Sequence, residues 1–436
     1  MYRKAIQQLL DWKNKKNHMP LILQGARQVG KTWLMKEFGK QYYKNVAYIS
    51  FDTNDTVKGI FNKGFNIERI ITELSLNVGF KIEPENTLIL FDEVQECQLA
   101  LTSLKYFNEN APQYDIIAAG SYLGIAHHEG TGFPVGKVEF INLYPLDFEE
   151  FLMATGNERF IEPIKNKAFD MVSTFKNDYE YFLKQYLYVG GMPKVVSDFV
   201  ENNDFNSVRK MQNTILNTYE QDFSKHIQSN IVEKIRMLWH SIPSQLAKEN
   251  KKFIYNAVKK GARAKDFELA LGWLRDCGLI YKIHRVTKPA MPLIAYEDFD
   301  VFKIYILDVG LLGALANLDS KTLIQGNAVF EEFSGTFAEQ YVLQQLKTIP
   351  DLPIYYWTNK RSQAEIDYLI QYEGYVIPVE VKATTNLKAK SLNNFINEYR
   401  PKKSVRTSLA DYKLNDNNLY DIPLYAIGNI AKVIEN

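Results

Sequence analysis

The sequence predicts an α/β protein with two sheet-containing parts separated by a helical segment. Short apolar runs alternate with longer helical stretches over the first third of the chain, which is typical of a mostly parallel sheet covered by helices. From about residue 147 to residue 250 the apolar residues follow helical spacing, and strand-like runs are scarce. Strand-like runs return from residue 354 onward, so a second α/β part ends the sequence.

Length and composition agree with a folded protein of several domains. The chain has 436 residues, of which 46% are apolar and 24% charged, so two or three ordinary globular domains are expected. Because the net charge is only +1, any contact with nucleic acid must use a local basic patch. The two cysteines, Cys97 and Cys277, have no metal-type spacing, which argues against a disulfide framework or a zinc site and suits a reducing compartment.

The sequence contains no membrane signal. The N-terminal residues lack the long apolar core of a signal peptide, and Ile6, Leu9 and Leu10 instead have helical spacing. The longest apolar stretch, residues 304–316, is interrupted by Asp308 and is too short to span a bilayer. We therefore expect a cytoplasmic protein without a membrane partner.

The elements of the first sheet can be placed in order from their apolar runs and helical spacing. Strands are predicted at 21–23, 46–50, 88–91 and 116–119, and helices at 32–43 and 66–78.

A phosphate-binding loop is predicted between the first strand and the first of these helices. Residues 25–32 read G-x-x-x-x-G-K-T in the strand–loop–helix context that gives this motif its meaning. The glycines allow backbone N–H groups to curl around an anion, and the helix N-terminus adds its dipole. Lys31 can reach the β- and γ-phosphates of ATP, and the Thr32 hydroxyl can bind Mg²⁺. The predicted ATP-binding residues are Gly25, Ala26, Arg27, Gln28, Val29, Gly30, Lys31, Thr32 and Trp33.

Two carboxylates end the third predicted strand. Asp92 suits a direct or water-mediated contact with Mg²⁺, and Glu93 can orient and polarise the attacking water as a general base. A surface acidic turn is the structural alternative, which the upstream loop on another parallel strand disfavours. Lys31, Asp92 and Glu93 are therefore the predicted catalytic residues, with Thr32 and Asp92 at the metal.

The fourth strand is followed by Gly120 and Ser121. The Ser121 side chain would face the γ-phosphate and report its presence. It could equally cap a helix, and the two roles are compatible.

The middle of the chain resembles a winged helix, a common DNA-reading module. Residues 251–286 read as two helices around Gly261 followed by the start of a β-hairpin. Basic residues gather there, so either contact with DNA phosphates or a solvated face of a domain that packs on its neighbours would fit. The basic cluster comprises Lys248, Lys251, Lys252, Lys259, Lys260, Arg263 and Lys265, and the predicted packing face of the second helix comprises Leu269, Leu271, Trp273, Leu274 and Leu279.

A second chemical site is predicted in the last α/β part. Strand alternation places Glu380 and Lys382 on one face, and a hairpin of strands 366–370 and 376–382 would bring Asp367 beside Glu380. The two carboxylates would bind a second divalent cation, and the lysine would stabilise or activate the attacking hydroxide. Glu339, on a preceding helix, could supply a further ligand. The pattern resembles the PD-(D/E)XK restriction-endonuclease-like fold, near the Holliday-junction-resolvase branch; a surface ion pair between Glu380 and Lys382 is the alternative.

Several segments resemble an AAA-superfamily ATPase family of bacteria and archaea whose members carry a C-terminal nuclease-like domain of unassigned function. These segments are GARQVGKT, LILFDEVQ, AAGSYL and INLYPLDFEEFL, followed by LYVGGMPKVV, KIYILDVGLL and VIPVEVK in the same order, so the resemblance covers nearly the whole chain. It implies that Gly25 to Thr32 bind phosphate, that Asp92 and Glu93 serve Mg²⁺ and water, and that Ser121 occupies the sensor position. The family usually has Gly-Arg where this chain has Gly136–Lys137, which puts an arginine-finger role there in doubt. Arg27, inside the loop, could take the arginine-finger role in place of Lys137. Packing of Arg27 against the sheet is the structural alternative.

Together these inferences predict a P-loop NTPase domain at 1–155, a helical and winged-helix segment at 156–320 and a nuclease-like domain at 321–436. The predicted function is binding and hydrolysis of ATP with Mg²⁺, coupled to action on or with DNA. The alternative is a nucleotide-controlled regulatory protein whose nuclease-like domain is inactive. A homo-oligomer is compatible with the superfamily.

Overall fold

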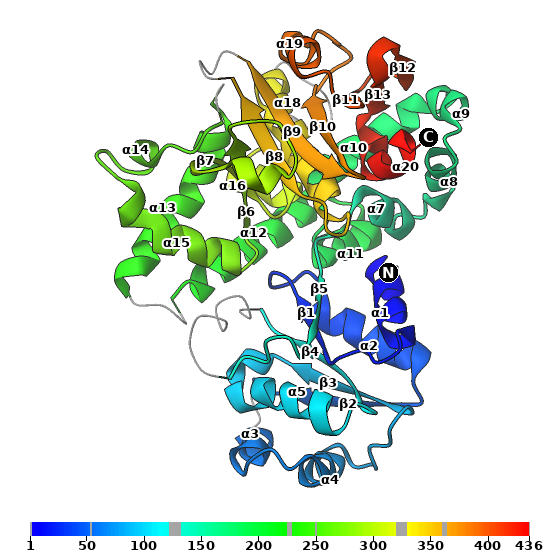
Figure 1. Ribbon diagram of the computed structural model, residues 1–436, viewed down its shortest axis with the longest axis vertical. Helices are drawn as coiled ribbons and strands as arrows, with labels where there is room; N and C mark the ends of the chain where they lie inside the picture. The colour runs from blue at the N-terminus through cyan, green and yellow to red at the C-terminus, as the bar shows by residue number, and fades with distance from the viewer. Residues whose placement is uncertain are drawn as a thin grey trace. The chain divides into compact units, whose positions relative to one another are not determined.

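The computed structural model describes residues 2–52, 55–121, 132–224, 229–248, 251–319, 329–359 and 364–435. The chain forms two compact units, coloured from blue to cyan and from green to red in Figure 1. The N-terminal unit contains residues 2–144 and the short stretch 276–279, and the C-terminal unit contains residues 145–275 and 280–436. The structure thus groups the predicted middle and last domains into one unit.

A five-stranded parallel sheet forms the centre of the N-terminal unit, in the order β2-β3-β4-β1-β5. All four predicted strands are present, and the sheet is parallel, as expected. Strand β4 lies between β1 and β3, so the loop that follows β1 and the carboxylates at the end of β3 reach the same edge of the sheet. The strands are β1 (Leu21–Gln24), β2 (Asn45–Ser50), β3 (Thr87–Asp92), β4 (Asp115–Ala119) and β5 (Glu139–Asn142).

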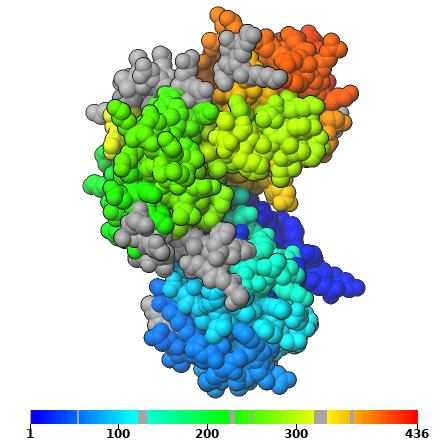
Figure 2. All heavy atoms as spheres, turned by 60° about the vertical axis from the view of Figure 1, so that its left-hand side comes forward, coloured from blue at the N-terminus to red at the C-terminus, as the bar shows by residue number. Residues whose placement is uncertain are grey.

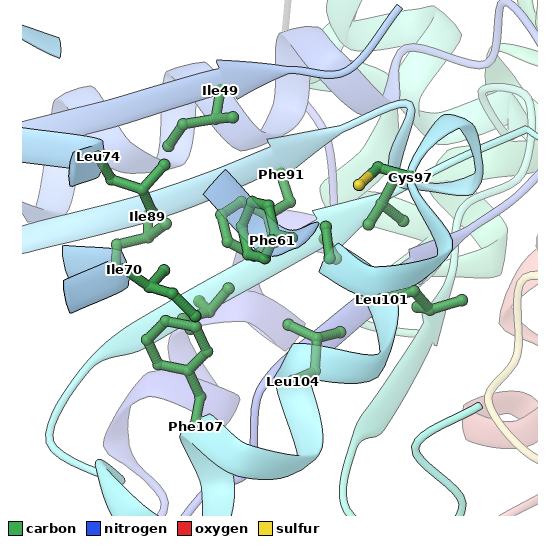
Figure 3. Packing of buried hydrophobic residues seen from close by; sticks show 14 of the residues in the cluster. Ile49, Phe61, Ile70, Leu74, Ile89, Phe91, Cys97, Leu101, Leu104 and Phe107 are labelled. Atoms are coloured by element: carbon green, nitrogen blue, oxygen red, sulfur yellow. The ribbon is translucent and has the colours of Figure 1, made fainter. Parts of the chain in front are cut away.

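Helices cover this sheet because its strands are apolar on both faces. On one face, α3, α4 and α5 pack on the odd-numbered side chains of β2 and β3, such as Ile49 and Phe91. Figure 3 shows part of this core, in which the rings of Phe61 and Phe91 lie 5.7 Å apart. On the other face α2 comes so close that a Cβ atom on its Gly39 would lie 2.6 Å from the Val46 side chain. The helices are α1 (Ala5–Asn14), α2 (Lys31–Tyr42), α3 (Asp55–Asn62), α4 (Ile67–Val78) and α5 (Gln98–Asn110).

The C-terminal unit begins with helices, as the apolar spacing predicts. Its helices are α7 (Phe148–Ala154), α8 (Ile161–Lys165), α9 (Phe169–Thr174), α10 (Lys176–Val189), α11 (Pro193–Asn202), α12 (Phe205–Asp222), α13 (Ser229–Leu246), α14 (Tyr255–Val258), α15 (Ala264–Asp276), α16 (Val309–Leu315), α18 (Val329–Lys347), α19 (Lys390–Tyr399) and α20 (Ile430–Ile434).

An eight-stranded mixed sheet completes this unit, in the order β12-β13-β11-β10-β9-β8-β6-β7. The predicted hairpin is the antiparallel pair β9–β10, in which Val379 lies opposite Tyr368. The hairpin that starts near residue 280 is β6–β7, and β6 also pairs with β8, so it is part of the same sheet. The strands are β6 (Ile280–Val286), β7 (Glu297–Ile306), β8 (Ile354–Thr358), β9 (Glu365–Tyr372), β10 (Tyr375–Val381), β11 (Ser404–Ser408), β12 (Lys413–Asn415) and β13 (Leu419–Pro423).

Three of the segments that carry the family resemblance meet in one buried polar junction of this unit. The Asp308 carboxylate accepts hydrogen bonds from the backbone N–H of Gly191 (2.6 Å) and from the Gln344 side chain (3.0 Å). A Cβ atom on Gly191 would lie 2.1 Å from the carbonyl oxygen of Leu146, and a Cβ atom on Gly310 would lie 2.5 Å from that of Val189. The glycines of these segments therefore allow the end of α10 to pack closely against α16 and against the residues before α7.

One predicted core residue is on the surface. Leu271, Trp273 and Leu274 of α15 are buried, but the Leu269 side chain is 74% exposed, so its placement in the packing face is wrong. The reason is helical geometry: the buried stripe of α15 runs through Phe267, Ala270 and Leu274, and Leu269 lies about 120° from its centre at 3.6 residues per turn. Within the described part of the chain, no helix combines the length and apolarity that crossing a membrane requires.

Candidate nucleotide site and a second polar cluster

The loop between β1 and α2 has the backbone that its glycines allow. Gly25 has φ +150°, and a Cβ atom there would lie 2.3 Å from the carbonyl oxygen of Leu143. Gly30 has φ +94° and stands directly before α2, where the helix N-terminus points its free N–H groups into the loop. The loop therefore has the curled form that can bind phosphate oxygens.

Lys31 joins this loop to the end of β4. Its ammonium group donates hydrogen bonds to the carbonyl oxygens of Gly25 and Ala26, both at 2.8 Å, and lies 3.4 Å from the Ser121 hydroxyl. Burial lowers the pKa of Lys31 to about 8, although the nearby carboxylates of Glu93 and Asp92 act in the opposite direction. The structure thus brings the predicted lysine and the predicted sensor serine together.

Asp92 accepts hydrogen bonds from three directions. Its Oδ2 atom accepts from the hydroxyls of Thr32 (2.8 Å) and Tyr48 (2.9 Å), and its Oδ1 atom accepts from the backbone N–H of Glu93 (3.1 Å). The carboxylate is buried at the tip of β3. The loop threonine and the strand carboxylate are therefore in direct contact.

Glu93 lies beside this contact in an unusual backbone conformation. Its φ is +51°, which is rare for a residue with a side chain and turns the chain sharply after β3. The Glu93 carboxylate accepts a hydrogen bond of 2.7 Å from the Gln95 side chain. The general-base candidate is thus held in one orientation.

The donor set at the loop fits Mg²⁺. Thr32 offers a hydroxyl oxygen and Asp92 a carboxylate oxygen, which are the hard oxygen ligands that this ion prefers. Two protein ligands are also what Mg²⁺ commonly uses beside substrate phosphates. Thr32 and Asp92 would hold the ion.

Arg3 supports the loop from the N-terminus of the chain and was not anticipated from the sequence. It is 3% exposed, and its guanidinium donates to the carbonyl oxygens of Val29 (2.9 Å) and Tyr144 (2.6 Å). Tyr48 was likewise missed, because its contact with Asp92 depends on the pairing of β2 with β3. Neither residue belongs to a local motif.

The structure also gives the contacts and burial of Lys137, Arg27 and Trp33, the remaining predicted residues of the N-terminal unit. Lys137 forms an ion pair of 3.0 Å with Glu109, so its charge is directed at α5. Arg27 is half-buried and close enough to Lys31 to lower its pKa. Trp33 is 42% exposed at the start of α2. Cys97 and Cys277 are both buried, and neither forms a disulfide.

The four residues of the second predicted site gather in the C-terminal unit, but Glu339 already has cationic partners. Its carboxylate is bonded to the Lys251 ammonium, accepts a hydrogen bond of 3.0 Å from the Tyr305 hydroxyl and lies 3.8 Å from the Lys303 ammonium. Lys303 is fully buried in β7 and also donates to Glu365. Burial would lower the pKa of Lys303, but Glu365 and Glu339 outweigh it and raise this pKa.

Asp367, Glu380 and Lys382 lie together on β9 and at the end of β10. Asp367 accepts a hydrogen bond of 2.8 Å from the backbone N–H of Val381, and Lys382 donates to Glu380 at 2.7 Å. Burial raises the pKa of Asp367, and the negative charges of Glu339 and Glu380 raise it further. The Oε2 atom of Glu380 is buried without a hydrogen-bond partner. The predicted juxtaposition of Asp367 and Glu380 is therefore present.

Among the residues that the structure describes, no group of three histidine, cysteine or carboxylate side chains is placed to hold a metal ion. The second cation predicted from the sequence thus has no support in the geometry of this cluster. Lys303 and Glu365 were missed, although a lysine inside the apolar run 301–307 is a usable signal of a buried ion pair.

The residues of the predicted basic cluster differ in their surroundings: two are bonded to neighbouring side chains and the other five are exposed. Lys251 is turned inward to Glu339, and Lys248 donates to Gln245 at 3.2 Å. The others are exposed around α14 and α15, in the green part of Figure 2: Lys252, Lys259, Lys260, Arg263 and Lys265.

Comparison with known families divides the chain in three. Residues 17–152 match an AAA domain, residues 181–322 a domain of unknown function (DUF8612), and residues 334–426 another domain of unknown function (DUF4143). Two curated relatives, uncharacterized proteins of Mycobacterium bovis and Mycobacterium tuberculosis, are each 30% identical over 114 residues. That stretch covers 26% of this chain and 22% of each relative, so the match spans well under two thirds of their length.

Solved structures of low sequence identity are also similar. The Walker-type ATPase PABY2304 of Pyrococcus abyssi is 14% identical, with a TM-score of 0.46 over 72% of this chain and 95% of its own. The Aeropyrum pernix Orc1 protein, solved in complex with DNA, is 8% identical, with a TM-score of 0.29 over 73% of this chain and 93% of its own. AMPPCP-bound DnaA of Aquifex aeolicus is 12% identical, with a TM-score of 0.27 over 63% of this chain and 86% of its own. The match to the AAA domain, together with the loop geometry, makes residues 17–152 an AAA-type P-loop domain.

Proposed function

We propose that this protein binds ATP with Mg²⁺ at the loop of residues 25–32 and hydrolyses it. The observation that carries the proposal is the 2.8 Å hydrogen bond between the Thr32 hydroxyl and the Asp92 carboxylate. It joins the phosphate loop to the acidic strand end, and Lys31, Glu93 and Ser121 lie around it. Binding alone would need only the loop. The adjacent general-base candidate favours hydrolysis.

Each residue has a definite task in the proposed reaction. The Lys31 ammonium exchanges its two carbonyl acceptors for β- and γ-phosphate oxygens. Glu93 orients a water molecule in line with the γ-phosphorus and accepts its proton. A bond from the water oxygen to the γ-phosphorus forms while the bond to the β–γ bridging oxygen breaks, and ADP leaves with the electron pair. Mg²⁺, when bound, neutralises charge on the phosphate oxygens.

Substitution of Lys31 tests this assignment. Lys31→Ala should lose ATP turnover and most of its nucleotide affinity, because an alanine side chain cannot reach the β- and γ-phosphates. Lys40→Ala, in the last turn of the same helix α2, is the matched control and should still bind nucleotide. Normal turnover in Lys31→Ala would remove the assignment.

A second candidate function is action on DNA by the C-terminal unit. Two observations favour it. The elements follow one another in the order α18-β8-β9-β10-α19-β11, which resembles the PD-(D/E)XK fold. Asp367, Glu380 and Lys382 lie side by side on this sheet. The exposed basic residues around α14 and α15 would supply phosphate contacts. ATP turnover would then move these parts on DNA.

The alternative is a nucleotide-controlled regulatory protein in which this cluster is inert. It is favoured by the ammonium groups of Lys251 and Lys303, which already neutralise Glu339. An assay on branched, single-stranded and linear DNA with Mg²⁺ or Mn²⁺ separates the two. Cleavage that disappears in Glu380→Ala supports nuclease action, and no cleavage of any substrate supports the regulatory role.

A further inference from the structure

The Asp92 carboxylate receives a hydrogen bond from a strand that contributes nothing to the recognised motifs. The Tyr48 hydroxyl of β2 donates to Asp92 Oδ2 at 2.9 Å, the same atom that accepts from Thr32 at 2.8 Å. We propose that Tyr48 is a positioning residue that fixes the Asp92 carboxylate for Mg²⁺-dependent nucleotide binding. This inference rests on the proposed ATP site and extends it to a residue outside the loop and strand motifs.

Strand pairing places Tyr48 where this role requires it. In the β2–β3 register Tyr48 lies opposite Leu90 and Ser50 lies opposite Asp92. Tyr48 and Asp92 are therefore on the same face of the sheet, two positions apart along neighbouring strands. This is the face that α2 covers, and α2 carries Thr32. The tyrosine and the threonine thus approach the carboxylate from different elements.

The tyrosine is held on its ring face as well as at its hydroxyl. The Lys36 ammonium of α2 lies 3.5 Å from the centroid of the Tyr48 ring, the distance of a cation–π contact. Lys36 follows Thr32 by one helical turn, so the two residues project from the same side of α2. Thr32, Lys36, Tyr48 and Asp92 therefore form one connected group that spans α2, β2 and β3.

The hydroxyls of Tyr48 and Thr32 both donate to Asp92 Oδ2, but only Thr32 is also a predicted metal ligand. The Tyr48 bond is the one that can hold Asp92 Oδ2 while Thr32 engages the ion. Because Mg²⁺ demands near-ideal octahedral geometry, its binding depends on the orientation of this carboxylate.

Tyr48→Phe removes the hydroxyl and keeps the ring under Lys36. We expect the Mg²⁺ concentration for half-maximal ATP turnover to rise severalfold, while kcat at saturating Mg²⁺ changes much less. A second readout does not need turnover. All five tryptophans lie in the part of the chain that the structure describes, and among them only Trp33, beside the loop, is exposed. Its fluorescence can therefore follow binding of a non-hydrolysable ATP analogue. Affinity should fall in Tyr48→Phe with Mg²⁺ present and should match the wild type in excess EDTA.

Tyr43→Phe is the matched control. It also removes one hydroxyl that donates a hydrogen bond to a carboxylate. The Tyr43 hydroxyl donates to Asp115 at 2.6 Å, at the other end of the strands. It should lower the melting temperature without moving the Mg²⁺ dependence. Tyr48→Phe with wild-type Mg²⁺ dependence in both readouts would overturn the inference and leave the proposed function intact. Equal Mg²⁺ shifts in both variants would also overturn it. A wild-type chain that binds no nucleotide would overturn the proposed function itself.

Discussion

The guanidinium of Arg3 donates a hydrogen bond of 2.9 Å to the carbonyl oxygen of Val29, inside the phosphate loop. The same group donates to the carbonyl oxygen of Tyr144 at 2.6 Å, so one buried side chain joins the loop to the segment that follows β5. Leu143 in this segment also packs against Gly25. The loop is therefore supported by residues far from it in sequence.

Arg3→Ala should loosen the loop. Loss of a buried, charged donor costs about 1.5–3 kcal/mol, and we expect this loss both in the free energy of unfolding and, in part, in nucleotide affinity. Arg3→Lys should recover less than half of it, because an ammonium group cannot donate in a planar fork to both carbonyls. Denaturant unfolding and nucleotide titration measure the two effects. Unchanged values for Arg3→Ala would show that the loop needs no such support.

Nucleotide affinity should depend on pH through Lys31. Burial lowers its pKa to about 8, so the charged fraction in the nucleotide-free protein falls from most molecules at pH 7 to about one in ten at pH 9. Phosphate binds the charged form, so the apparent Kd should rise about tenfold as pH increases through this range. Lys31→Met should show weak binding without this rise. A constant Kd between pH 7 and pH 9 in the wild type would contradict the assignment.

Lys303→Met tests the charge balance of the second cluster. This substitution leaves Glu339, Glu365 and Asp367 without their shared buried cation, which should destabilise the protein by about 3–5 kcal/mol at neutral pH. Acid should reduce the loss, because carboxylates that have lost their partner take up protons more readily. Urea unfolding at pH 5 and pH 7.5 measures the difference. A loss that is the same at both pH values would mean that Lys303 acts by packing and not by charge.

Local patterns were enough to predict the parts of the fold in which chemistry and spacing coincide. The runs around β1, β3 and β4 combine buried strands with polar ends, so local sequence alone predicts that Lys31, Thr32, Asp92 and Ser121 lie together, as they do. The hairpin β9–β10 could also be predicted from local sequence. Side chains alternate between the two faces of a strand, so Glu380 and Lys382 are expected on the same face.

Contacts that depend on long-range pairing could not be predicted. Tyr48 reaches Asp92 only because β2 pairs with β3 in one register, and Arg3, which precedes α1, contacts Val29 across 26 positions of the sequence. The partners of Glu339 come from Lys251 and Lys303, which are distant in sequence. The exposed Leu269 shows the opposite case, because an apolar residue on a helix is buried only when its angular position lies on the packed face.

The most direct test of ATP hydrolysis at this site is to measure nucleotide binding and phosphate release in the same preparation of Glu93→Gln, with Glu96→Gln as the matched control. Glu93→Gln should bind ATP as the wild type does and should release phosphate at least 100-fold more slowly, as expected for loss of a general base. Glu96→Gln, on the turn that follows, should retain wild-type turnover. Wild-type phosphate release by Glu93→Gln would contradict the account.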